Sequence, residues 1–201
     1  LQLQGTLRDL PLQLTGQLAL QQQQQHYQLQ TTGLTLQHGP NQLQLTGSLA
    51  EQWQSKLQLT VTDLSQSLPQ SEGQIHGSIV LTGAAATPDI QLSITGSTLN
   101  YLDDYLLDSF SLQGQLKSLG QLPSQLSLQV GKGQAPGLQL QQLDWQLAGT
   151  LQSHQSHLLL ESHQLQAVIA TEGRWQQQQW QATWQEVRLK SDLGDWSLQQ
   201  P

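Results

Sequence analysis

Histidines and acidic residues are the side chains of this sequence that could do chemistry, and they form two groups in the sequence. The first group consists of His154, His157, Glu161 and His163. Such residue types bind zinc, but on a strand the last three would share one face while His154 would point to the other. The chain has no cysteine, and it lacks the two histidines on a helix that metalloproteases use. We therefore expect solvated side chains here, with no metal site and no cofactor.

A second group, Asp103, Asp104 and Asp108, lies between Tyr101 and Phe110. Calcium loops carry their oxygen ligands at regularly alternating positions, which this spacing does not provide. Serine is abundant, but no Gly-x-Ser-x-Gly nucleophile elbow occurs. We interpret the acidic group as a charged turn, and we expect no catalytic residue and no enzymatic activity.

The strands that would position these side chains are indicated most clearly between Gly73 and Tyr101. Apolar residues occupy alternate positions there, namely Ile75, Ile79, Leu81, Ile90, Leu92 and Ile94. A period of two is typical of a half-buried strand, because successive side chains point to opposite faces of the sheet. Residues 84–89 separate the two runs and include Pro88, which predicts a turn. The unit is a strand, a turn and a strand with one apolar face.

The same alternation recurs along the chain, often as Leu-x-Gly-x-Leu. The central glycines are Gly5, Gly16, Gly47, Gly114 and Gly149. Their spacing is too irregular for a strict solenoid, so we predict an all-β, mostly antiparallel meander with strands of about eight residues. A glycine on an apolar face costs packing, and we interpret these glycines as bulges that curve the sheet. Further turns are predicted at 39–41, 131–133 and 135–137.

Residues 62–69 break the period. Thr62 or Asp63 is a candidate N-cap and Pro69 ends the segment, so we predict one helical turn that covers an end of the sheet. The glutamine run 21–25 is interpreted as a strand that continues into a loop, and the run 176–179 as a hairpin turn. No linker is visible, so we expect residues 1–201 to form a single segment.

Six tryptophans raise the question of a sugar-binding platform. They are Trp53, Trp145, Trp175, Trp180, Trp184 and Trp196. They are dispersed in the sequence, and most are in register with leucines. We therefore expect them to fill the core.

The composition excludes several classes of function. Charged residues make up only 10% of the chain, the net charge is -7, and no basic patch is visible, so we expect no nucleic-acid partner. Leucine on one face and glutamine on the other account for the recurring Leu-Gln-Leu pattern. No stretch approaches the roughly 18 apolar residues of a membrane-spanning helix, and the absence of cysteine fits an oxidising compartment.

The order of the motifs resembles the repeats of the TamB proteins, which are relatives of the AsmA-like proteins. The most informative stretch runs from Gly73 through Gly83 to Tyr101, with glycines and aliphatic residues alternating on one face. The pattern Gly47-Ser-Leu49-Ala-Glu-Gln-Trp53 before it and Gly173-Arg-Trp175 after it agree. The resemblance extends from about Leu43 to Leu198. The high glutamine content departs from the family, but it falls on the outer face and leaves the inner pattern intact.

The resemblance implies a sheet folded lengthwise into an elongated half-pipe, the β-taco, with an apolar concave groove. Family members are inner-membrane-anchored subunits of the translocation and assembly module of Gram-negative bacteria, cross the periplasm, and work with a TamA-like outer-membrane barrel insertase. They are implicated in outer-membrane protein assembly and in phospholipid transport between the membranes. We accordingly expect a periplasmic fragment of a much longer, inner-membrane-anchored protein, since the sequence begins inside a repeat and without Met.

The residue pattern supports this on separate grounds, since a sheet with one apolar face must bury it against something and no second layer is visible. We expect phospholipid acyl chains or nascent outer-membrane β-strands to be the partners. Two alternatives remain open: a sealed structural β-solenoid of a secreted adhesin, or a chaperone that captures nascent strands at its sheet edges. The expected groove lining is Leu14, Leu45, Leu59, Ile79, Leu81, Ile90, Leu92, Ile94, Leu128 and Leu140.

Overall fold

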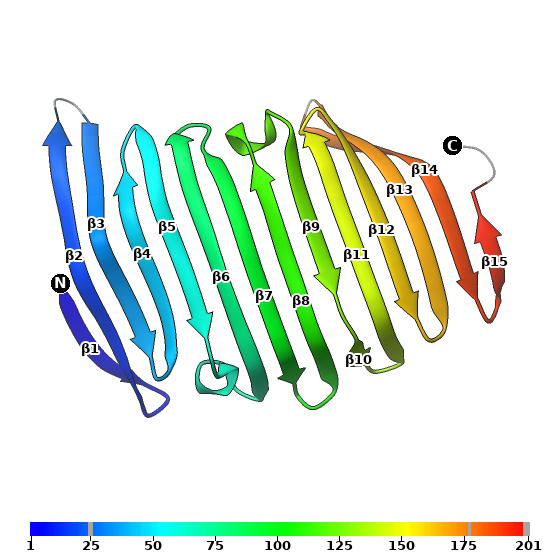
Figure 1. Cartoon of the computed structure of the whole chain (residues 1–201), viewed down its shortest axis with the longest axis horizontal. Coiled ribbons are helices and arrows are strands. Elements are labelled where there is room, and N and C mark those ends of the chain that lie inside the picture. Colours follow the sequence, from blue (N-terminus) through cyan, green and yellow to red (C-terminus); the bar gives the residue numbers. More distant parts are fainter. Residues whose placement is uncertain (24–25, 177, 199–201) are drawn as a thin grey trace.

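The described part of the chain in the computed structural model, residues 1–23, 26–176 and 178–198, forms one antiparallel sheet of 15 strands (Figure 1). The strands are Gln2–Leu7 (β1), Leu10–Gln23 (β2), His26–His38 (β3), Asn41–Leu49 (β4), Gln52–Val61 (β5), Ser71–Ala84 (β6), Asp89–Tyr101 (β7), Tyr105–Leu116 (β8), Ser124–Val130 (β9), Gly133–Ala135 (β10), Leu138–Thr150 (β11), Ser153–Ser162 (β12), Leu165–Gln176 (β13), Gln179–Ser191 (β14) and Gly194–Ser197 (β15). Two 3-10 turns accompany them, Leu64–Gln66 (η1) and Ser118–Gly120 (η2). Among these residues no helix has the length and hydropathy needed to cross a bilayer.

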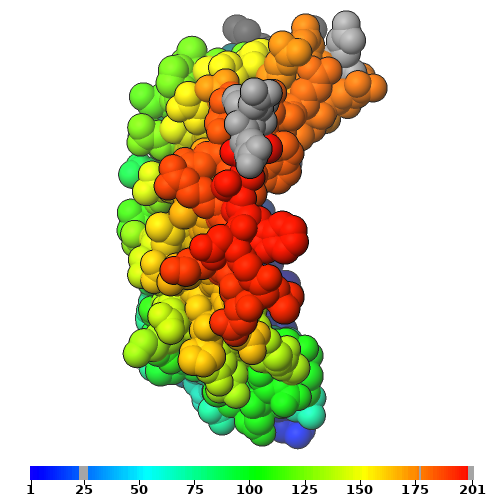
Figure 2. All heavy atoms as spheres, turned by 90° about the vertical axis from the view of Figure 1, so that its right-hand side faces the viewer, coloured from blue at the N-terminus to red at the C-terminus, as the bar shows by residue number. Residues whose placement is uncertain are grey.

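The strands follow one another across the sheet in the order of the sequence, which confirms the predicted all-β meander. One place in the sheet is shared: β9 and β10 both lie between β8 and β11. Most strands are longer than the expected eight residues, and β6, with 14 residues, reaches about 46 Å at 3.3 Å per residue. Seen from the side, the sheet has a crescent outline with one hollow flank (Figure 2).

The register of the strands lines up their apolar residues in rows that run across the sheet. Residues directly opposite one another on antiparallel strands share a face. The row that we call the central row is Leu3, Leu14, Leu36, Leu43, Leu59, Gly77, Ile94, Leu112, Leu128, Trp145, Leu158, Ile169 and Val187. The adjacent row is Gly16, Leu34, Leu45, Leu57, Ile79, Leu92, Gly114, Leu126, Leu147, Ser156, Thr171 and Trp184. One face of the sheet is therefore apolar along the central row from β1 to β14 and along the adjacent row from β2 to β11.

The opposite face is polar, and the described residues form no second layer over either face. A row on the polar side runs through Gln44, Gln58, Ser78, Ser93, Gln113, Ser127, Gln146 and His157. In the described part of the chain only two apolar side chains, Val61 and Ala167, are buried. The leucines of the apolar rows are mostly half-buried, because they cover one another sideways but not from above. This arrangement has no sealed core of the kind that the adhesin-like alternative requires.

Several glycines on the apolar face make room for a side chain of the next strand. The ring of Phe110 lies where a Cβ atom on Gly96 would stand, and Leu126 takes the same place at Gly114. Gly73, by contrast, lies in a register shift of β6 with φ at 118°, as expected for a bulge. The bulge interpretation therefore applies to Gly73, whereas Gly96 and Gly114 serve close cross-strand packing.

Most predicted turns are found, and one is wrong. Turns at 39–40, 85–88 and 136–137 connect neighbouring strands, and η1 occupies the segment that breaks the period. The chain does not reverse at 131–133, since Gly131 donates a backbone hydrogen bond to the carbonyl oxygen of Ser109 at 2.8 Å and Asp108 donates one to that of Lys132 at 2.8 Å. The hairpin predicted at 176–179 forms, with Gln176 opposite Gln179. The loop expected at 24–25 lies outside the described residues.

Gly47 offers a test of the close strand packing. It stands opposite Ser55 with φ at 114°, and a Cβ atom there would collide with the backbone of Gln54 and Ser55. We expect Gly47→Ala to lower the free energy of unfolding by about 2–4 kcal/mol, measured by urea denaturation, since backbone strain and overpacking each cost roughly 1–3 kcal/mol. Gly5→Ala is the control, because no atom lies within 4 Å of its Cβ position. Equal losses in the two variants would contradict the account.

Candidate functional site

The structure places the ten leucines and isoleucines expected to line a groove on the apolar face, all of them half-buried. Leu14, Leu59, Ile94 and Leu128 belong to the central row, and Leu45, Ile79 and Leu92 to the adjacent row. Leu81 and Ile90 are direct cross-strand partners beside them. Leu140 lies apart, beyond a register shift of β11. The structure thus brings nine of the ten together and puts Leu140 at a separate end of the strands.

At that end the apolar face closes into a pocket of about 400 Å³, which we call the end pocket. Leu64 and Leu68 from the η1 segment form one wall. The leucine and isoleucine side chains that the sheet contributes are Ile75, Leu99, Leu106, Leu107, Leu138 and Leu140. The groove list contained only Leu140 of these. The sequence could have indicated that Leu64 and Leu68 act together, because residues four apart on a helical turn lie on the same side.

The η1 turn is shaped by Asp63, which is its N-cap and one of the two residues predicted for that position. Its Oδ1 accepts hydrogen bonds from the backbone N–H of Ser65 at 3.1 Å and from the Ser65 hydroxyl at 2.6 Å, and Oδ2 accepts one from the Gln66 amide at 2.9 Å. Hydrogen bonds to a carboxylate favour its charged form. The pKa of Asp63 is accordingly lowered, chiefly by the Ser65 side chain and then by Gln66.

Two buried polar residues, His38 and Asn41, fasten this turn to the β3–β4 connection. Asn41 Nδ2 donates to the carbonyl oxygen of Asp63 at 2.7 Å and to Ser67 Oγ at 2.8 Å. Asn41 Oδ1 accepts from the backbone N–H groups of Thr62 at 3.1 Å and Asp63 at 3.2 Å. Every polar atom of this amide is therefore paired, as burial requires.

The protonation of His38 follows from its partners. Nε2 lies 2.9 Å from the carbonyl oxygen of Leu7, which can only accept, so Nε2 carries the proton. In a neutral imidazole, Nδ1 then accepts a hydrogen bond from the hydroxyl of Ser67 at 3.1 Å. We call His38, Asn41, Asp63, Ser65 and Ser67 the polar clasp. It holds the η1 segment over one end of the apolar face.

The tryptophans were expected in the core, and four of the six are exposed. Trp175, Trp180, Trp184 and Trp196 have 45–62% of their surface in solvent. Trp175 stands directly opposite Trp180, and with Trp184 they lie on the β13–β14 hairpin, whose orange end projects from the crescent in Figure 2, while Trp196 lies on β15. Trp180 also stacks on buried His154, with ring centroids 4.2 Å apart. The core assignment is wrong for them because β13–β15 lie at one edge of the sheet, where fewer strands flank them.

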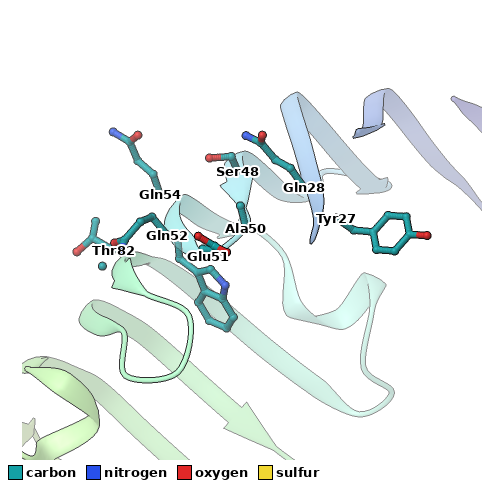
Figure 3. A pocket seen from close by; sticks show the side chains of 10 residues that line it. Tyr27, Gln28, Ser48, Ala50, Glu51, Gln52, Gln54 and Thr82 are labelled. Carbon is teal, nitrogen blue, oxygen red and sulfur yellow. The ribbon is translucent and has the colours of Figure 1, made fainter. Parts of the chain in front are cut away.

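A polar hollow of about 1000 Å³ lies between the ends of β3, β4, β5 and β6, far from the end pocket along the strands. Figure 3 shows Gln28, Ser48 and Gln54 extended to one side of the strands while the ring of Tyr27 points elsewhere. These groups do not converge on one point, as a catalytic site requires. Within the described ranges no three His, Cys, Asp or Glu side chains gather in a way that could hold a metal ion.

Comparisons with known proteins agree on one family. The family model described as "TamB, N-terminal domain" matches residues 1–201. The translocation and assembly module subunit TamB of Haemophilus influenzae is 24% identical to this chain over 196 residues, which cover 96% of the chain and 15% of that protein. The chain therefore spans only a small part of this relative's length. No solved structure matches the chain significantly.

Removing the central amide of the polar clasp should destabilise the turn. Asn41→Ala leaves the backbone N–H groups of Thr62 and Asp63 without their acceptor, and we expect a loss of about 2–3 kcal/mol in the free energy of unfolding. Urea denaturation measures it, together with faster hydrogen exchange at Thr62. Gln37→Ala is the control, since its exposed amide donates only to the Gly39 carbonyl at 3.2 Å and should cost less than about 0.5 kcal/mol. Unchanged exchange at Thr62 would contradict the clasp.

The lowered pKa of Asp63 makes the turn sensitive to acid. The carboxylate stabilises the turn fully above its unfolded pKa, and this contribution disappears as the pH falls through the lower folded value. Ser65→Ala removes the largest cause, so the pKa of Asp63 should rise toward the ordinary value of 3.8 in a carboxyl ¹³C NMR titration. Ser67→Ala should leave that pKa where it is, because Ser67 does not bond the carboxylate. A shift of the same size in both variants would refute the assignment.

Proposed function

The chain belongs to the TamB family, and from this premise we propose that it is a non-enzymatic periplasmic segment whose apolar face carries phospholipid acyl chains between the inner and outer membranes. The observation that supports this most is the continuous pair of apolar rows on a single-layer sheet. With only Val61 and Ala167 buried among the described apolar residues, the rows need a partner that the chain itself does not supply. A long exposed apolar strip of this kind marks a binding surface.

Acyl chains suit this face for a physical reason. They need apolar contact and no hydrogen-bond partner, and burial stabilises them by roughly 0.8 kcal/mol per methylene. Because the rows cross the sheet without a polar interruption from Leu14 to Leu147, a chain can move from strand to strand without losing contact. We propose that the crescent is the wall of a half-pipe with this face inside, and that the glutamine face outside keeps it in water.

The wider setting follows from the family. We propose that the chain is part of a longer protein of the translocation and assembly module, anchored in the inner membrane, and that through this protein it works with a TamA-like outer-membrane insertase. Its residues 1–201 form a single segment of the half-pipe. Lipid transport and outer-membrane protein assembly both fit a segment of this kind.

The sheet edges support a second candidate, capture of nascent outer-membrane β-strands. β1 pairs with β2 only from Leu10 to Thr15, and β15 pairs with β14 only from Arg188 to Ser191. A strand edge without a neighbour can pair with an extended chain through its backbone. This activity would depend on the edges and not on the apolar rows.

A pair of neighbouring residues on β7 separates the two candidates. Leu92 lies in the adjacent row and is half-buried, whereas Gln91 points to the polar face and is exposed. Leu92→Arg should lower the uptake of a fluorescent phospholipid at least tenfold, because a guanidinium in the row must be desolvated when an acyl chain covers it. Gln91→Arg should leave uptake within about twofold. Equal uptake by the two variants would overturn the lipid face, and retained strand capture by Leu92→Arg would favour the edges.

A further inference from the structure

We infer that the end pocket and the polar cavity beside it bind one phospholipid molecule with an amine-bearing, zwitterionic head, an inference that rests on the proposed lipid-carrying function. The two cavities share Gln134, Ala135 and Leu138, so they lie side by side at the same end of the strands. One is apolar and the other polar. A pair of this kind matches an amphiphile, whose tail and head make opposite demands.

The end pocket fits a hydrocarbon tail. Its aliphatic wall of Leu64, Leu68, Leu99 and Leu107 offers no hydrogen-bond partner, so a peptide there would leave its backbone groups unpaired at a cost of several kcal/mol. The hydroxyl of Ser71 is already engaged, because it donates to the carbonyl oxygen of Leu68 at 2.7 Å. The volume of about 400 Å³ lies within the range of small-molecule sites.

The pocket wall is fixed before a ligand arrives. The polar clasp holds the η1 segment on one side, and Leu102 donates a backbone hydrogen bond to Gln70 at 2.9 Å on the other. The same bond joins the η1 segment to the β7–β8 turn, which carries Asp103 and Asp104 of the neighbouring polar cavity. Tail wall and head site are therefore parts of one connected unit, and little ordering is needed on binding.

The neighbouring cavity, about 480 Å³, carries the chemistry for a zwitterionic head. Asp103 and Asp104 lie on its wall, and in the described part of the chain neither carboxylate is paired with a cation. Asp103 accepts a hydrogen bond from Asn100 at 3.0 Å, which orients it. An ammonium group is the complement of such carboxylates. His163 and Gln164 also line this cavity, and their side chains carry N–H groups that can donate to a phosphate.

The charge of the protein argues against an anionic lipid. The net charge is -7, and a head with no ammonium would meet the two aspartates without compensation. Tyr101 and Tyr105 line the end pocket and flank the turn that carries Asp103 and Asp104; both are about half exposed, and their ring centroids are 6.3 Å apart. Tyrosine suits a boundary between apolar and polar surroundings, because its ring contacts apolar atoms while its hydroxyl stays in water.

The test compares two lysolipids with the same acyl chain, lysophosphatidylethanolamine and lysophosphatidylglycerol, titrated into the 201-residue chain below their micelle concentrations. We expect the ethanolamine lipid to bind at least fivefold more tightly. The double variant Asp103→Asn and Asp104→Asn should abolish this preference, and the matched variant Asp192→Asn and Asp195→Asn, with the same change in charge, should keep it. Asparagine is suited to position 103, where φ is 58°. Equal affinity of the wild type for both lipids, or tighter binding of the glycerol lipid, overturns the inference.

A nitroxide on the acyl chain of the ethanolamine lipid locates the tail. Methyl NMR signals of Leu107 and Leu140 should broaden most, and Leu107→Gln should reduce the affinity at least fivefold. Broadening confined to Ile79 and Leu92 overturns the end pocket while leaving the proposed lipid face intact. If neither lysolipid binds, the inference is overturned. If the wild type also takes up no phospholipid, the proposed function is overturned as well.

Discussion

The apolar face of a single β-sheet has to be covered, and in the described part of this chain only the η1 segment covers one end of it. A helix or a second sheet would normally supply the missing layer, but the described residues contain only two short 3-10 turns besides strands. The leucines shield one another along the rows and remain half-buried. The free energy that a closed core would contribute is therefore partly left for a ligand. The proposed function and the end pocket both follow from this constraint.

Because each strand pairs with its neighbours in the sequence, the apolar side chains form continuous rows across this face. The meander keeps the central row in register through Leu59, Ile94 and Leu158 although the strands differ in length. Glycines such as Gly96 and Gly114 let a larger residue of the next strand lie across them, so the rows continue where a second bulky side chain would collide. Only where the polar clasp holds η1 over the sheet does the apolar face form the end pocket. The η1 segment thus covers one end of the apolar face and at the same time forms a wall of the site where a lipid can bind.

Local sequence patterns predicted most of the fold. The period of two between Ile75 and Ile94 predicted β6, β7 and their turn, and Asp63 was recognisable as an N-cap. The failures concern information that is not local. Gly131-Lys132-Gly133 has the composition of a turn, yet the chain does not reverse there: the strand is interrupted between β9 and β10, and both segments pair with the same neighbours, β8 and β11. The exposure of Trp180 depends on its place at the edge of the sheet, which its own sequence context does not reveal. The end pocket joins residues from Leu64 to Leu140, so the full fold was needed to find it.

The central claim is that the apolar face is occupied by lipid, and native mass spectrometry of the chain purified from bacterial cells tests it most directly. The account predicts masses above that of the polypeptide, with phospholipid identified after solvent extraction of the same sample. A single mass equal to that of the bare chain under gentle conditions, with no lipid in the extract, would contradict it.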